Sequence, residues 1–212
     1  MTTKMRLPGM AVLGLLFFIE ACAPVFSEMQ GARTVGENRL EIMPSGSLVS
    51  VTEDNESEGV QNHVGFQVAY GLTSRCDLRL RYEYLWLDED SDTHFSVLGI
   101  GPKYSFLENK IAFYLPVGRA FGEDSKDSWE LQPTLLFSIP AIKDRLDINL
   151  SPKYLFILCE DCEDLVAFNF GLSFSNNLSR WSVRPEYGLL YDPGESGHFS
   201  HFSVGLAFAF GK

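Results

Sequence analysis

The chain has 212 residues, of which 45% are hydrophobic and 13% aromatic, and it carries a formal net charge of -11. This length suits one domain with a sizeable core, and the negative charge disfavours nucleic acid, whose phosphates attract Lys and Arg. No internal apolar run reaches the roughly 20 residues that a membrane-spanning helix requires. If the chain spans a bilayer, it must do so as a closed β-barrel, because open sheet edges cannot be satisfied in lipid.

The N-terminus has the layout of an export signal. Lys4 and Arg6 precede an apolar run over residues 7–19, and a positive start followed by a short apolar stretch is typical of a secretory signal peptide. We therefore expect residues 1–22 to be a signal peptide and the mature protein to be exported across the inner membrane.

The end of this signal resembles a bacterial lipobox. Residues 19–22 read Ile-Glu-Ala-Cys, and the resemblance implies that Cys22 is the acylated residue, although Glu20 is an unusual occupant of its position. An ordinary cut after Ala23 is the alternative, but it would leave Pro24 next to the scissile bond, which signal peptidases tolerate poorly. We expect lipidation at Cys22, with an ordinary cleaved signal or a structural cysteine as the other interpretations.

Residues 23–38 are mixed in character, with Gly31 and Gly36 breaking any helix, and we interpret them as a periplasmic tether or a small plug. From residue 39 to 212 the sequence becomes a regular meander, in which segments of roughly ten residues alternate in character and are separated by turn-forming clusters. We expect strands over residues 39–51, 60–72, 77–87, 94–106, 111–121, 129–139, 146–158, 166–174, 181–189 and 199–210.

This pattern predicts an all-β fold, a closed antiparallel up-and-down transmembrane β-barrel of about ten strands. An even number of strands puts both ends of the barrel on the periplasmic side. Prolines inside the expected strands oppose this reading, because a missing N–H breaks the ladder, and we interpret them as tolerated kinks or as bulges that bend the wall. They are Pro44, Pro102, Pro116, Pro133, Pro152 and Pro185.

The charged residues of the expected strands share one parity, opposite to that of the large apolar residues. Charges that face the narrow bore of such a barrel should pair across it, because unpaired buried charge is expensive. We therefore predict a charge network that closes the lumen, with a narrow pore for small solutes as the alternative. The network comprises Arg79, Arg81, Glu83, Lys103, Glu130, Asp147, Lys153, Arg184 and Glu186.

The connections between strands form two chemically distinct sets, which implies two compartments. The acidic set covers residues 53–58, 88–92, 123–127, 160–164 and 192–195, and the short set carries Arg75, Lys110, Lys143 and Arg180. Aromatic residues flank both sets, as in interfacial girdles: Trp86 and Trp129 lie beside the acidic loops, and Tyr70, Tyr104 and Trp181 lie beside the short turns. A soluble, lipid-binding barrel of lipocalin type is the rival fold.

The last strand carries a further signal. The spacing of Ser203, Gly205, Phe208 and Phe210 resembles the C-terminal signal by which outer-membrane β-barrels are handed to their assembly machinery, although two residues follow the final aromatic. Nearly the whole chain after residue 22 resembles a small bacterial outer-membrane β-barrel protein. The resemblance implies the outer membrane of a Gram-negative bacterium as location, with outer-membrane lipids and the β-barrel assembly machinery as partners. We expect no cofactor and no metal, and the oligomeric state stays open.

Function is less constrained than fold. We favour a structural or surface-exposed, non-enzymatic barrel, with the narrow pore next and a hydrolase third. Outer-membrane hydrolases keep a histidine near the outer rim, and here His63 and His201 have the inward parity, with Ser50, Ser200 and Glu195 as the candidate nucleophiles or orienting group. No spacing makes this arrangement specific.

A CxxC motif, Cys159 to Cys162, lies in an acidic loop. A structural zinc site needs four ligands, so a local disulfide in an oxidising compartment is the favoured interpretation. Cys76 lies in an expected periplasmic turn, where it is a bystander or forms an intermolecular bond.

Overall fold

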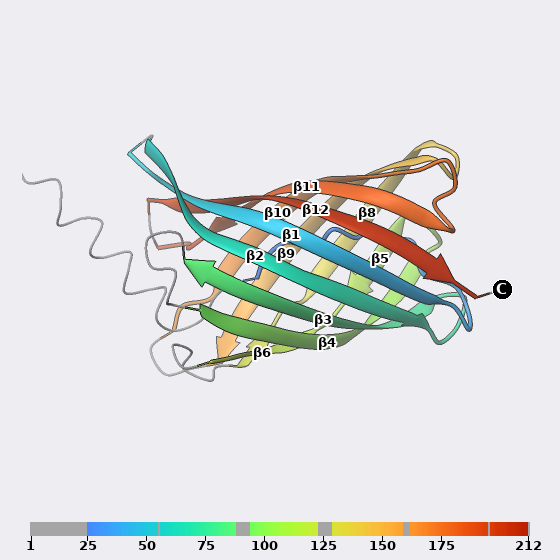
Figure 1. Cartoon of the computed structure of the whole chain (residues 1–212), viewed down its shortest axis with the longest axis horizontal. Coiled ribbons are helices and arrows are strands. Elements are labelled where there is room, and N and C mark those ends of the chain that lie inside the picture. The colour runs from blue at the N-terminus through green and yellow to red at the C-terminus, as the bar shows by residue number, and fades with distance from the viewer. Residues whose placement is uncertain are drawn as a thin grey trace, which may run out of the picture.

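The computed structural model describes residues 25–54, 56–87, 94–122, 129–158, 162–194 and 196–211. The strands are β1 (Leu40–Glu53), β2 (Glu56–Gly71), β3 (Cys76–Leu87), β4 (His94–Leu107), β5 (Ile111–Tyr114), β6 (Val117–Phe121), β7 (Trp129–Leu131), β8 (Thr134–Ile142), β9 (Leu146–Leu158), β10 (Leu165–Phe174), β11 (Trp181–Tyr191) and β12 (His198–Phe210). They form one antiparallel sheet that closes into a barrel (Figure 1), because β12 pairs with β1 and β9 pairs with β10. No helix in these residues is long and apolar enough to cross a membrane.

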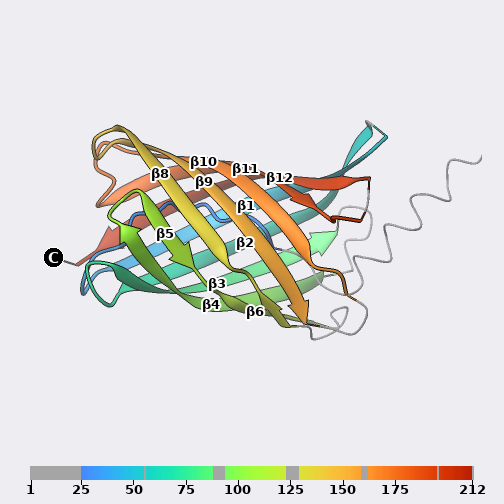
Figure 2. The same cartoon turned by 180° about the vertical axis from the view of Figure 1, so that it is seen from behind.

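The twelve strands make ten traverses of the wall. Strands β5 and β6 are two halves of one traverse, and both pair with β4 (Figure 2). Strands β7 and β8 are two halves of another traverse, and both pair with β9. The two breaks fall at Pro116 and Pro133, where the N–H needed by the ladder is missing. The closed antiparallel barrel of about ten strands predicted from the sequence is confirmed.

The wall stays closed at both breaks because the proline carbonyls are still paired. The Gln132 N–H donates to the Pro116 carbonyl at 3.0 Å, and the Tyr154 N–H donates to the Pro133 carbonyl at 3.1 Å. The other four prolines noted in the sequence lie within unbroken strands. They are Pro44, Pro102, Pro152 and Pro185.

The two ends of the barrel differ in their connections. At the turn end lie the short links at residues 72–75, 108–110, 143–145 and 175–180, together with the start of β1 and the end of β12. At the loop end lie the links that the sequence marks as acidic. The first of these is shorter than expected, because β1 and β2 continue as a paired hairpin as far as Glu53 and Glu56; a bulge between Val49 and Ser50 lets the register shift on the way.

The two faces of the wall are inverted with respect to a soluble protein. Large apolar side chains point outward and stay accessible, with exposed fractions of 65% at Ile139, 62% at Leu48 and 53% at Phe170. Charged and polar side chains point inward and are buried, among them Lys103 and Glu83 at 0%.

Residues 25–38 do not extend away from the barrel. They precede β1 and run through the bore, the blue thread inside the barrel in Figures 1 and 2. Every residue from Val25 to Gln30 is buried. Of the two interpretations given for this segment, the structure therefore corresponds to the plug and not to a periplasmic tether.

Candidate functional site

The plug, residues 25–38, enters the bore near the loop end and leaves it at the turn end. Val25 packs against Leu85, Phe95 and Ala120, which lie one or two residues from the loop ends of β3, β4 and β6. At the other end the Thr34 hydroxyl donates to the carbonyl of Ser74 in the β2–β3 turn, at 2.9 Å. The segment therefore spans the length of the lumen.

An apolar collar surrounds the first two residues of the plug. The Phe26 side chain packs in it, and its ring makes an edge contact with the His201 ring, with 4.7 Å between centroids. Phe26 itself is buried, with an exposed fraction of 1%. The collar consists of Leu85, Phe95, Val97 and Ala120 around Val25, and of Val49, Leu155, Ala167 and Leu190 around Phe26.

Beyond the collar the plug is bound by charged side chains of the wall. The Glu28 carboxylate lies 2.6 Å from the Lys153 ammonium, and both groups are buried. The Arg81 guanidinium donates to the carbonyl and the hydroxyl oxygen of Ser27, each at 2.5 Å. Charge-assisted hydrogen bonds of this kind are the strong ones, so they fix the plug in depth and rotation.

Glu186 of β11 binds the plug backbone. Its two carboxylate oxygens accept from the N–H groups of Glu28 at 2.5 Å and Met29 at 2.7 Å. From β2, the Gln67 amide donates to the Glu28 carbonyl at 3.0 Å. One peptide unit of the plug is thus held from two sides of the barrel.

The second half of the plug is bound in the same manner. The Lys103 ammonium donates to the carbonyl of Gly31 at 3.0 Å and to that of Arg33. The Arg33 guanidinium forms ion pairs with Asp147 and with Asp144. Both are pairs of opposite charge, and they hold this part of the plug against the start of β9 and the turn before it.

Residues 25–38 belong to no strand of the sheet, so their polar groups depend largely on side chains. A buried N–H or C=O without a partner costs about 1–3 kcal/mol. Wall side chains supply most partners: Gln132 binds the Val25 carbonyl, Asn169 the Phe26 carbonyl, Ser138 the Ala32 N–H, and Asp77 the Val35 N–H. The inner wall therefore forms a binding site for residues 25–38.

Several of the remaining charges pair within the wall. Glu41, which the sequence analysis did not single out although it shares the inward parity, lies 2.6 Å from Arg184 and 3.5 Å from Arg79. Arg81 lies 2.9 Å from Glu83. All nine predicted lumen residues lie in the bore, buried or half-buried: Arg79, Arg81, Glu83, Lys103, Glu130, Asp147, Lys153, Arg184 and Glu186.

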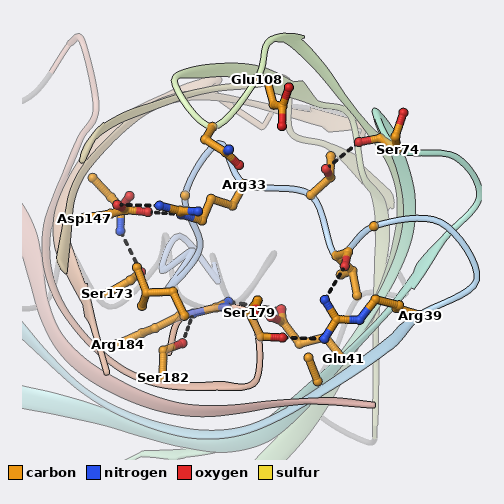
Figure 3. A pocket seen from close by; sticks show the side chains of 18 residues that line it. Arg33, Arg39, Glu41, Ser74, Glu108, Asp147, Ser173, Ser179, Ser182 and Arg184 are labelled. Atoms are coloured by element: carbon orange, nitrogen blue, oxygen red, sulfur yellow. Dashed lines mark hydrogen bonds and ion pairs between the residues drawn. The ribbon is translucent and has the colours of Figure 1, made fainter. Parts of the chain in front are cut away.

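A cavity of about 280 Å³ opens at the turn end (Figure 3). The guanidinium groups of Arg33, Arg39 and Arg184 and the carboxylate of Glu41 lie around it. Each arginine has protein acceptors: Arg33 has Asp147, Arg184 has Glu41, and Arg39 donates to the Val35 carbonyl. The cavity is therefore lined by arginines that already have protein acceptors, which are carboxylates for Arg33 and Arg184 and a backbone carbonyl for Arg39.

The two inward histidines are buried, and the Phe26 ring of the plug contacts His201. His63 and His201 are 4% and 2% exposed. A ring nitrogen of His63 lies 2.7 Å from the Gln61 amide, and Nδ1 of His201 lies 2.7 Å from the Ser203 hydroxyl. They are parts of the polar lining of the bore.

The candidate nucleophiles lie elsewhere. Ser200 is adjacent to His201 on β12, so strand alternation turns it to the opposite face of the wall, and Ser50 is its register partner on β1. Glu195 lies outside the described residues. These serines and the two inward histidines do not form a nucleophile and base pair.

The cysteines separate into two kinds. Cys162 is disulfide-bonded, and its predicted partner Cys159 lies outside the described residues, as does the predicted lipidation site Cys22. Cys76 is free and half-buried at the start of β3.

The four residues of the predicted assembly signal lie on β12, which pairs with β1 to close the barrel. Ser203 and Gly205 face the bore, whereas Phe208 and Phe210 face outward with exposed fractions of 44% and 54%. Their role in assembly stays a prediction.

The outer surface of the barrel shows which environment surrounds the protein. Apolar side chains cover it around the whole ring, far beyond the few hundred Å² of apolar patch that a soluble monomer exposes. Trp129 is exposed near the loop end, and Tyr70, Tyr104 and Trp181 are exposed near the turn end, as in two interfacial girdles. The protein is an outer-membrane β-barrel. A soluble lipocalin-like barrel, the rival fold, would carry its apolar face inside and is excluded.

No known family and no curated protein matches the sequence. Among solved structures, the barrel is similar to the attachment invasion locus protein Ail of Yersinia pestis, with 12% identity, a TM-score of 0.40, and coverage of 82% of this chain and 99% of that chain. It is also similar to the N-terminal β-barrel domain of Pseudomonas aeruginosa OprF, with 14% identity, a TM-score of 0.38 and coverage of 82% and 99%.

The COG4313 outer membrane channel from Pseudomonas putida F1 gives 9% identity, a TM-score of 0.39 and coverage of 89% of this chain and 100% of that chain. Likenesses this low carry no argument about function, so the assignment rests on the barrel's own inverted surface.

Proposed function

We propose that the protein is a structural, surface-exposed barrel whose lumen is kept shut by its own plug. The observation that carries this proposal is the path of residues 25–35, which fill the bore and are bound by wall charges along its length. Outer-membrane lipids would surround the apolar band, and the assembly machinery would recognise the end of β12. The protein would thus act through its outer surface and not through a solute path.

Conductance in a planar bilayer tests this proposal. The folded, detergent-purified protein should be silent across voltages, because the plug fills the bore and binds charged side chains of the wall. A variant that lacks residues 25–35 should show steady steps, since removal of the plug leaves a bore lined by Arg81, Lys153 and Glu186. Steady, ion-selective steps from the unaltered protein would overturn the proposal.

A second variant serves in case the deletion does not fold. Phe26→Ala leaves the charged contacts of the plug in place but removes the ring that fills the collar. Brief openings are expected from this variant, whereas Thr34→Ala, which alters only an exposed hydrogen bond of the plug to the turn end, should stay silent. Silence of both the deletion and the Phe26 variant would show that something other than the plug closes the bore.

A narrow pore is the second candidate. The wall charges that bind the plug would line a water path if the plug moved out, and they are of both signs. Substitution of Arg81 by Gln should then change the ion selectivity of any conductance that the unaltered protein shows. The geometry does not favour the hydrolase, because both inward histidines are buried in the lining of the bore.

A further inference from the structure

Much of the binding between the wall and the plug goes to the main chain of the plug. The carbonyls of four consecutive plug residues each accept a hydrogen bond from a different part of the wall. The donors are Gln132 for Val25, Asn169 for Phe26, Arg81 for Ser27 and Gln67 for Glu28. Every peptide unit carries the same carbonyl, so these contacts do not depend on the side chains of the bound segment.

The second half of the plug is bound through its main chain as well. Lys103 donates to two carbonyls of the plug, and two N–H groups of the plug, at Ala32 and Val35, donate to Ser138 and Asp77. The plug belongs to no strand, and its covalent link to the wall runs through residues 36–39, ahead of β1. A separate peptide in the same extended conformation would present the same groups to the wall.

We propose that the bore is a binding site for an extended segment of another polypeptide, and that the plug is the intramolecular occupant of this site. The inference rests on the proposed plugged barrel and names the class of ligand that the same site accepts. A segment tethered by a short link has an effective concentration on the order of millimolar. The plug therefore excludes a peptide supplied in trans as long as its own link to β1 is intact.

Two positions near the collar give the site a sequence preference. The Phe26 ring fills the apolar collar, so an aromatic residue is required there. Two residues later, the Glu28 carboxylate lies 2.6 Å from the Lys153 ammonium, with both groups buried. A neutral or basic residue at this position would leave the lysine buried without its carboxylate, which is costly.

Two further positions complete the preference. A Cβ at Gly31 would lie 2.5 Å from the Ser138 hydroxyl oxygen and would also meet the Asn149 side chain. Ser138 cannot easily turn away, because it donates to Asn149 at 2.7 Å and accepts the Ala32 N–H at 2.8 Å. At position 33 a base pairs with Asp147. The ligand class is thus an extended segment with an aromatic residue, an acid two positions later, a glycine three positions after that, and a base two positions further.

Refolding in the presence of a labelled peptide tests the proposal. A protease site is inserted after Glu37, an exposed residue ahead of β1, and the purified, folded protein is cut there. The cut protein is unfolded in urea and refolded in detergent with a large excess of a fluorescent synthetic peptide of residues 25–38. The label should bind to saturation at one peptide per barrel, because the cut plug has lost the advantage of its tether.

Gel mobility of unheated samples reports whether the cut barrel has refolded. A cut barrel that refolds without binding the label would overturn the proposal. A cut chain that does not refold even with the peptide present would also overturn it, because the site would then work only within one chain. The uncut chain, refolded in the same way, should take up little label; equal uptake by the two would mean that the label binds outside the bore and would overturn the proposal.

Altered peptides test the ligand class. Glu28→Lys in the peptide should weaken binding about tenfold or more, because it removes a charged hydrogen bond and places a second cation beside Lys153. Gly31→Val should weaken it by a similar factor, because its side chain meets Ser138 and Asn149. Thr34→Ala, which loses only an exposed hydrogen bond to the turn end, should bind like the unaltered peptide. Equal binding of all these peptides would contradict recognition in the bore.

Failure of this inference and failure of the proposed function give different results. Steady conductance from the unaltered protein removes the plug from the lumen and with it both proposals. A silent, unaltered protein whose cut form takes up no label keeps the closed barrel and removes peptide binding in trans alone.

Discussion

At the scale of single residues, the lumen is organised by charges that bind backbone. Glu186 accepts two plug N–H groups, and Lys103 donates to two plug carbonyls. Each of these buried charges satisfies backbone groups of the plug, and those groups in turn stabilise the buried charge. Removal of one partner therefore costs more than the bond itself, since the other partner stays buried and unpaired.

Glu186→Gln tests this coupling. The amide replaces one of two acceptors by a donor, so one N–H of the plug loses its partner, and we expect a loss of about 1–3 kcal/mol in the free energy of unfolding. Hydrogen exchange should accelerate at the amides of Glu28 and Met29, with little change in the hairpin of β1 and β2. Glu108→Gln, at an exposed position of the turn end, is the matched control. Equal exchange at the plug amides in both variants would contradict the anchoring role of Glu186.

At the scale of elements, the sequence was informative about strands and less so about their interruptions. Period-two alternation located the traverses, because inward and outward residues of a membrane barrel have opposite chemistry. It could not show which prolines break a strand. Pro102 and Pro152 lie within continuous strands, whereas Pro116 and Pro133 divide theirs, and the difference depends on which neighbour requires the missing N–H.

The break at Pro116 brings the chain close to the facing strand, β4, and this contact can be tested. Leu115 and Pro116 approach β4 so closely that a Cβ at Gly101 would lie 2.3 Å from the Leu115 carbonyl oxygen, a backbone atom that cannot turn away. Gly101→Ala should therefore lower the free energy of unfolding by about 1–3 kcal/mol. Gly99→Ala, two residues earlier on the same face, would meet its nearest atom at 3.8 Å and should be close to neutral. Equal urea midpoints for the two variants would contradict the close approach.

At the scale of the whole molecule, the bilayer is the solvent of the outer face. Phe170 lies in the middle of β10 with its ring exposed, and Leu72 lies just beyond β2 at the turn end. Phe170→Arg should cost about 2–4 kcal/mol in lipid vesicles and Leu72→Arg only about 0–1, because the cost of a charge falls from the midplane to the interface. Equilibrium unfolding in urea measures both. A larger loss at Leu72 would contradict the position of the membrane.

The plug is the part that the sequence predicted least well. Residues 23–38 have no periodicity, and their two glycines indicated only that no helix forms. The alternation of residue types along the strands identified the inward charges. It could suggest only that these charges pair with one another across the bore. That Glu28 and Arg33 are partners of Lys153 and Asp147 depends on how far an irregular segment enters the lumen, and no local pattern encodes this depth.

The path of the plug also determines the order of assembly. Glu28 and Glu186 are 158 residues apart in the chain, and the seam between β1 and β12 joins Leu40 to Phe210. The plug is bound by strands from around the wall, so we expect the N-terminal residues to lie within the curling sheet before the last strand arrives. Contacts this distant in sequence form slowly. We therefore expect the barrel to close late, around a plug that is already in place.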